Sequence, residues 1–446
     1  MSRSVGWEST FNQIAEVLNQ YVERGEQVLL HLVAEESQFT RFNRGRVRQT
    51  GQVSDGQLEL TLIGSGRVCD RILPFTGDKE TDWPLIAAAL VEARQELPQL
   101  PEDPFLVTPR GAATSREEYP GQILEAAAVP EAILAPLTGT DSAGLYAGGR
   151  CIRGYADSLG QLHWFETETF TLDYSLFTAD GQAVKEVLAG NYWDAAQYER
   201  QIETCRQFLG LMGRSPKAVP RGQYRTYLAP AAVADLLSMF SWGGISEAAL
   251  RRSGGALRAL QQNERQLSPK FHLRENFGRG LVPRFNQWGE VAPTELPLIA
   301  SGELVNTLIS SRTAQEYGLV SNYAVTAEHL RAPEVSPGTL NEADILKQLD
   351  TGLYVSNLHY LNWSDQPKGR VTGMTRYACF WVEQGEIVAP IQNLRFDESL
   401  YRCFGDCLVD LTQSVVCVPE VGSYEHRALG GAWVPGVLVD EFTYTL

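Results

Sequence analysis

The sequence predicts a strand-rich, multi-domain α+β protein, with N-terminal α/β units and a large, mainly antiparallel β domain at the C-terminus. The chain has 446 residues, which exceeds the usual size of one domain and is typical of two or three. Hydrophobic residues make up 43% and charged residues 21%, as in ordinary globular proteins. Short β-type segments separated by turn residues outnumber the helical stretches. Together these features favour layered sheets over a helical bundle.

The first predicted domain spans residues 1–100. Apolar residues from Trp7 to Tyr21 have helical spacing, and residues 81–97 form a second helix with Leu85 on its apolar face. Between the helices, the pattern predicts short strands at 27–34, 37–42, 46–53, 57–63 and 68–75. Turns are expected at Arg44-Gly45, at Asp55-Gly56 and at residues 64–66.

Two proline-containing joints separate the later domains. Four prolines between residues 98 and 109 indicate a linker, and a central domain is predicted over 110–215. In it we expect a helical stretch at 124–137, β segments at 143–156 and 161–174, and a helix at 194–212. The third domain, 220–446, is predicted to open with a strand at 223–228 and a helix from Pro230. It should also contain a hairpin at 377–391 and a closing strand at 437–446.

Charge and composition exclude several classes of partner. Lys plus Arg total 38 and Asp plus Glu total 54, so the net charge is −16. Such a surface repels phosphate backbones and anionic lipid, and we expect no direct nucleic-acid or membrane binding. The N-terminus lacks an apolar signal-peptide core, and no 18 apolar residues run together. The seven scattered cysteines are expected to be reduced thiols of a cytoplasmic protein.

Familiar catalytic motifs are missing from the sequence. The six histidines lie more than five residues apart, so neither HExxH nor HExxxH occurs, and there is no GxSxG. Cys403 and Cys407 do not have the CxxC spacing of zinc sites, so buried small apolar residues are the expected interpretation. A site built from His359, His426 and the Cys403/Cys407 region stays open as an alternative.

An ordered set of segments resembles the TldD/PmbA family, which has been named as modulators of DNA gyrase. Residues 36–43 read ESQFTRFN and are followed by GRV at 45–47, and residues 302–318 read GELVNTLISSRTAQEYG. GLYV at 352–355, Thr372-Gly373, VEQGEI at 382–387 and Pro390 follow in the order of the family's C-terminal core. SYEHR at 423–427 is similar to the PmbA/TldE side of the family.

The resemblance implies a metallopeptidase relative whose zinc site is lost. TldD-type members carry HExxxH on the first helix of the last domain and a cysteine ligand near the C-terminus. Here the matching stretch, 228–243, reads LAPAAVADLLSMFSWG. It places Ser238 and Gly243 at the histidine positions and Met239 at the glutamate position, and no clear cysteine counterpart exists. We therefore expect no catalytic residue and no metal ligand in this chain.

The resemblance further implies a subunit role. TldE-type proteins form heterodimers with a zinc-bearing TldD-type partner that degrades or trims unfolded peptides, so zinc is expected in the partner. A peptide could pair with an exposed strand edge around residues 371–376, with Thr372, Gly373 and Arg376 as candidate contacts. The alternatives are a non-catalytic, homodimeric peptide-binding module and an independent hydrolase with an unrecognised site.

Overall fold

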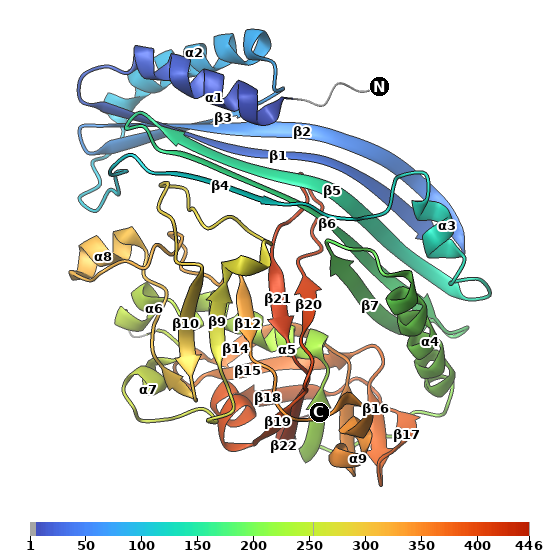
Figure 1. Ribbon diagram of the computed structural model, residues 1–446. Coiled ribbons are helices and arrows are strands. Elements are labelled where there is room, and N and C mark those ends of the chain that lie inside the picture. The colour runs from blue at the N-terminus through green and yellow to red at the C-terminus, as the bar shows by residue number, and fades with distance from the viewer. Residues whose placement is uncertain (1–5, 253, 446) are drawn as a thin grey trace.

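The N-terminal half forms one curved sheet. The computed structural model describes residues 6–252 and 254–445. The strand order is β3-β2-β1-β5-β6-β4, with β7 beside β6 (Figure 1). Its strands are β1 (Glu26–Asn43), β2 (Arg46–Gly64), β3 (Arg67–Pro74), β4 (Thr114–Tyr119), β5 (Asp141–Asp157), β6 (Leu162–Phe177) and β7 (Ala183–Gly190). Because β1 pairs with β5, strands from both predicted N-terminal sections join the same sheet.

Helices cover the convex face of this sheet and one of its ends. The helices α1 (Trp7–Leu18) and α2 (Lys79–Glu96) lie above it in Figure 1. They bury alternate apolar residues of β1, such as Leu30 and Leu32, because successive side chains of a strand face opposite sides. Near the far end lie α3 (Val129–Leu134) and α4 (Ala195–Met212).

Four details of the sequence prediction are wrong. The paired segments expected at 27–34 and 37–42, and at 46–53 and 57–63, are continuous long strands, β1 and β2. Asp55-Gly56 is not a turn: a Cβ on Gly56 would lie 2.5 Å from the Phe75 carbonyl oxygen, so the glycine permits a close approach. The helix expected at 124–137 is limited to α3, which has Pro130 in its first turn and ends before Pro136. Leu85 is 43% exposed and faces solvent.

The C-terminal half contains two further sheets. One has the order β11-β10-β9-β12-β21-β20, and the other runs β14-β15-β18-β22-β8-β13-β16-β17 with β19 beside β22. The strands of the first sheet are β9 (Leu273–Asn276), β10 (Glu295–Ala300), β11 (Glu303–Leu304), β12 (Pro333–Val335), β20 (Val416–Pro419) and β21 (Gly431–Val434). The strands of the second are β8 (Gly222–Leu228), β13 (Gly352–Val355), β14 (Asn357–Asp365), β15 (Arg370–Arg376), β16 (Phe380–Glu383), β17 (Glu386–Pro390), β18 (Arg395–Ser399), β19 (Leu408–Leu411) and β22 (Val437–Tyr444).

One helix of this half lies in the core. Helix α5 (Pro230–Met239) packs against β8, β14 and β21 and buries Val233, Leu236 and Leu237. The shorter helices are α6 (Glu247–Arg251), α7 (Arg258–Gln261), α8 (Ser311–Tyr317) and α9 (Ile345–Leu349). The predicted α+β class, the opening strand and helix, and the β16–β17 hairpin with Gly385 at φ 80° are confirmed.

Some expectations extend beyond the described residues. The start of the N-terminal segment, residues 1–5, and the last residue of the predicted closing strand, 446, lie outside them. Within the described part of the chain, no helix is both long enough and apolar enough to cross a membrane. All seven cysteines are free, and Cys403 and Cys407 are buried, as expected of small apolar residues.

Candidate functional site

A cavity of about 650 Å³ lies between the concave face of the N-terminal sheet and the C-terminal half. Its sheet side carries His31 of β1 and Arg153 of β5, whose side chains share one face because Val33 pairs with Arg153 and His31 with Tyr155. The other walls come from α5, from β20 and β21, and from the segments 282–287 and 325–333. Both halves of the chain are therefore needed to form the cavity.

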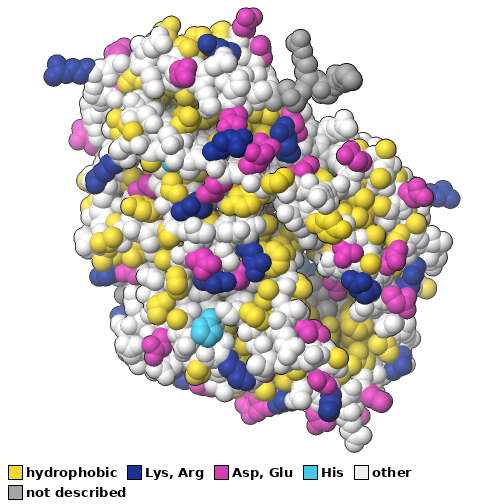
Figure 2. All heavy atoms as spheres, viewed as in Figure 1, with side chains coloured by type: hydrophobic (Ala, Val, Ile, Leu, Met, Phe, Trp, Pro, Cys, Tyr) yellow, Lys and Arg dark blue, Asp and Glu magenta, His cyan; other side chains and the backbone are white. Residues whose placement is uncertain are grey.

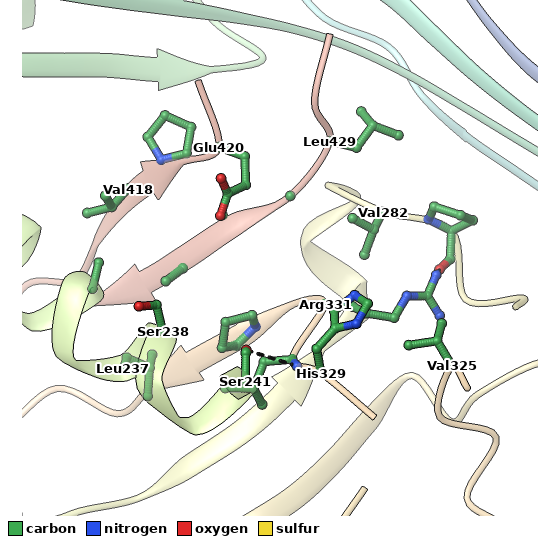
Figure 3. Close-up of a pocket in the computed structure, with 18 of the residues that line it drawn as sticks. Leu237, Ser238, Ser241, Val282, Val325, His329, Arg331, Val418, Glu420 and Leu429 are labelled. Atoms are coloured by element: carbon green, nitrogen blue, oxygen red, sulfur yellow. Dashed lines mark hydrogen bonds between the residues drawn. The ribbon is translucent and has the colours of Figure 1, made fainter. Parts of the chain in front are cut away.

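Helix α5 presents its polar side to this cavity (Figure 3). The helix begins at Pro230, whose missing N–H costs nothing in the first turn. Ser238 lies at the cavity, and its hydroxyl donates a hydrogen bond to the Asp235 carbonyl oxygen at 2.7 Å. The Asp235 carboxylate accepts a hydrogen bond from the Leu358 N–H at 3.2 Å, while burial raises its pKa to about 7.

The three positions expected to correspond to the family's zinc motif face different environments. Ser238 is exposed at the cavity, whereas Met239 is only 2% exposed and belongs to the C-terminal core. Gly243 has a left-handed φ of 79° and ends the helical stretch, as the sequence predicts. A Cβ on Gly243 would lie 2.7 Å from Nε2 of Gln366.

This donor set does not fit a catalytic zinc ion. Zinc sites use cysteine, histidine or carboxylate ligands, three of them in catalytic centres. A neutral serine, a buried thioether and a glycine supply neither these ligands nor a base. Over residues 6–252 and 254–445, no group of three or more His, Cys, Asp or Glu side chains is arranged to hold a metal ion.

The side of the cavity opposite Ser238 is basic. Arg331 lies across from Ser238 in Figure 3, and His329 precedes it on the same segment. Burial, together with the positive charges of Arg153 and Arg331, lowers the pKa of His31 to about 4. Burial also lowers the pKa of His329, with Arg331 as a second cause. Basic groups from both halves of the chain therefore line the same cavity.

Buried hydrogen bonds hold the segment that carries Arg331. The carboxylate of Glu275, on β9, accepts the N–H of Arg331 at 2.7 Å and that of Ala332 at 2.5 Å. Burial raises the Glu275 pKa to about 7. The Ser241 hydroxyl accepts the Leu330 N–H at 3.1 Å, the dashed line in Figure 3. These hydrogen bonds fix the backbone of residues 330–332, and with it the part of the cavity wall that this segment forms.

The segment between β20 and β21 closes another side of the cavity. Glu420 and Leu429 line it, and Arg427 is 7% exposed. Arg427 donates hydrogen bonds from Nη1 to the Gly149 carbonyl oxygen and from Nη2 to that of Thr169, each at 3.0 Å. The SYEHR stretch noted in the sequence therefore joins the C-terminal half to the N-terminal sheet.

The predicted strand edge is wrong. Strand β15 pairs with β14 on one side and with β18 on the other, so its backbone offers no edge to a peptide. The Thr372 hydroxyl already donates to the Phe396 carbonyl oxygen at 2.9 Å, and a Cβ on Gly373 would meet the Phe396 ring at 2.7 Å. The Arg376 guanidinium lies over the Tyr377 ring. None of the three lines the cavity.

The residues of the alternative composite site lie in different surroundings. His426 contacts Gln57 of the N-terminal sheet, whereas His359 lies on β14 beside Tyr360. Cys403 and Cys407 are buried in the C-terminal core, where burial raises the pKa of both thiols and disfavours a reactive thiolate.

Sequence reasoning missed the basic cavity residues, which are His31, Arg153, His329 and Arg331. His31 gave a signal, because it interrupts an apolar run of β type at 28–33. The other three lie far apart in the sequence, and only the packing of the two halves brings them together.

Comparison with known proteins places this architecture in a family. The family model described as the PmbA/TldA metallopeptidase C-terminal domain matches residues 221–445, about half of the chain. No curated protein matches the chain significantly.

Solved structures with the same fold cover nearly the whole chain. A candidate modulator of a DNA gyrase from Thermotoga maritima has a TM-score of 0.75 and 14% identity, covering 98% of this chain and 100% of its own. TldE from Thermococcus kodakarensis has a TM-score of 0.73 and 12% identity, with the same coverage. A candidate modulator of DNA gyrase from Bacteroides thetaiotaomicron has a TM-score of 0.75 and 16% identity, covering 97% of this chain and 98% of its own. With its C-terminal half matched by the family model and its fold shared along its length, this chain belongs to the TldD/PmbA family of metallopeptidase-like proteins.

Proposed function

We propose that this chain is the non-zinc, TldE-like subunit of a two-chain metalloprotease that degrades or trims unfolded peptides. A TldD-type partner supplies the zinc ion and the hydrolytic chemistry. This chain supplies part of the peptide-binding groove. The observation that carries the proposal is that α5 lines a cavity of about 650 Å³, while Ser238 and Met239 of this helix and Gly243 in the turn after it supply no metal ligand.

The physical properties of the cavity support a binding role. Its volume of about 650 Å³ is typical of sites that enclose small ligands or short peptide segments. Apolar side chains such as Leu237, Val282 and Leu429 share the walls with the basic and acidic groups. Such mixed walls can bury apolar peptide side chains while polar groups fix the orientation.

The test is a reconstitution with a purified TldD-type homologue. Peptidase activity on an unfolded substrate is measured for this chain alone, for the homologue alone and for the mixture, and size-exclusion chromatography follows complex formation. We expect activity of the mixture to exceed that of either chain alone. A mixture made with a homologue whose HExxxH glutamate is replaced by glutamine should be inactive.

Two outcomes would overturn the proposal. Zinc-dependent peptidase activity of this chain alone, or of the mixture with the inactivated homologue, would assign the chemistry to this chain. A stable homodimer that binds peptide, and that neither associates with the homologue nor changes its activity, would instead support a homodimeric peptide-binding module.

A further inference from the structure

The two arginines of the cavity have no carboxylate partner, although another arginine of the same strand, β5, has two. On β5, Arg150 pairs with Glu36 and, at 2.9 Å, with Glu166. Figure 2 shows acidic and basic side chains interspersed over the visible face. By contrast, among the described residues neither Arg153 nor Arg331 forms an ion pair within 4.0 Å.

Both cavity guanidinium groups keep unused hydrogen-bond donors. Arg153 donates from Nη1 to the Ile152 carbonyl oxygen at 2.8 Å, which leaves most of its donors unused. Arg331 donates from Nη2 to the carbonyl oxygens of Pro283 and Phe285, whereas its Nη1 is buried without a partner in the described structure. Unsatisfied buried donors of a charged group are costly, so an acceptor that enters the cavity would relieve that cost.

The neighbouring groups favour an anion at this end of the cavity. His31, Arg153 and Arg331 line the same cavity, and the charges of both arginines lower the pKa of His31. The Glu275 oxygens already accept two backbone N–H groups. The remaining acids that line the cavity, Asp235 and Glu420, belong to α5 and to the segment after β20 rather than to the segments that carry the two arginines.

We propose that Arg153 and Arg331 form a carboxylate-binding site in this cavity, which selects peptides through a free C-terminal carboxylate or an acidic side chain. This rests on the proposed peptide-binding function of the same cavity. A guanidinium group offers a planar pair of donors that matches the two oxygens of a carboxylate. The two arginines come from different halves of the chain, so a bound carboxylate would also bridge these halves.

The test measures binding of fluorescent peptides to the purified full chain by anisotropy. Three peptides share one apolar sequence: one has a free C-terminal carboxylate, one a C-terminal amide, and one an amide together with a single internal glutamate. We expect the peptide with the free carboxylate, or the one with the glutamate, to bind at least about tenfold more tightly than the amide peptide. The loss of a charge-assisted hydrogen bond implies a difference of this size. Which of them gains affinity identifies the source of the carboxylate.

Variants connect the effect to the two arginines. Arg153→Gln loses only one hydrogen bond within the protein, so it should fold normally and reduce the preference for carboxylate about tenfold or more. Arg331→Lys keeps the charge but loses the planar donor pair, and should weaken the preference less. Arg41→Gln, an exposed arginine on β1 away from the cavity, should retain the preference.

Several results would overturn the proposal. The first is equal affinity for all three peptides. The second is an unchanged preference for the carboxylate peptide in Arg153→Gln. The third is that inorganic phosphate competes for the site as well as the carboxylate peptide does. The measurement needs no partner, so a carboxylate preference without activation of a TldD-type homologue would contradict the subunit role alone. Activation without a preference would contradict the carboxylate site alone.

Discussion

The two faces of the N-terminal sheet use the same strands for different purposes. On the convex face, Leu30 and Leu32 of β1 are at most 1% exposed and pack in an apolar core beneath α1 and α2. On the concave face, His31 lies between them in sequence and lines the cavity with Arg153. Strand alternation thus separates a face that stabilises the fold from a face that holds groups whose burial lowers their pKa.

The largest expected effect concerns the convex face. Phe11 of α1 is fully buried, and its ring lies 6.1 Å from that of Trp164 between centroids. Phe11→Ala should lower the free energy of unfolding by about 3–5 kcal/mol, because it removes buried apolar surface and leaves a cavity. Urea unfolding measures the loss.

The matched control is Leu85→Ala on the outer side of α2. Leu85 is 43% exposed, so its replacement should change the free energy of unfolding by less than about 0.5 kcal/mol. Equal losses for the two variants would show that the convex core does not hold this half together.

Much of this contrast could be predicted from the sequence, and some of it could not. The period of apolar residues in 7–21 and the turn at Arg44-Gly45 predict α1 and the β1–β2 hairpin, because these signals are local. The joining of β1 to β5 depends on strands about one hundred residues apart, for which no local signal exists. The side that Leu85 faces depends on where α1 packs, and a helical pattern alone does not specify it.

The candidate site shows the same limit of prediction from the sequence. The sequence marks Ser238, Met239 and Gly243 through the family resemblance, and the structure places only Ser238 at the cavity. Arg153 and Arg331 are unremarkable charged residues in the sequence. Their shared environment arises from packing between the two halves.

The second prediction concerns the concave face and acid stability. The ordinary histidine pKa of 6.5 falls to about 4 for His31 in the folded chain. Between pH 6.5 and 4 the unfolded chain therefore binds more protons at this residue. The stability present above pH 6.5 is lost as the pH falls towards 4. His31→Gln should remove this loss, on the order of 1–3 kcal/mol at pH 4 relative to wild type.

Thermal unfolding of both proteins from pH 8 to pH 4 measures this difference. Asp235 and Glu275 have raised pKa values of about 7, so they contribute in the opposite direction, with stability lost as the pH rises through 7. Both residues are present in wild type and variant, and their effect cancels in the comparison. Parallel pH profiles would show that His31 is not the source of the acid sensitivity.

The smallest expected effect is at the cavity wall itself. Ser238 is exposed there, and its hydroxyl donates only to the carbonyl oxygen of Asp235 within the same helix. Ser238→Ala should change the free energy of unfolding by less than about 0.5 kcal/mol, because the lost hydrogen bond is offset by the higher helix propensity of alanine. Ser246→Ala is the matched comparison: this hydroxyl is 7% exposed, accepts the Ala249 N–H as the cap of α6 and donates to Glu328 at 2.6 Å. Its loss should cost about 1–2 kcal/mol. A cost for Ser238→Ala as large as that for Ser246→Ala would mean that the cavity wall, like the convex core, is built for stability, and the contrast between a stabilising face and a binding face would no longer hold.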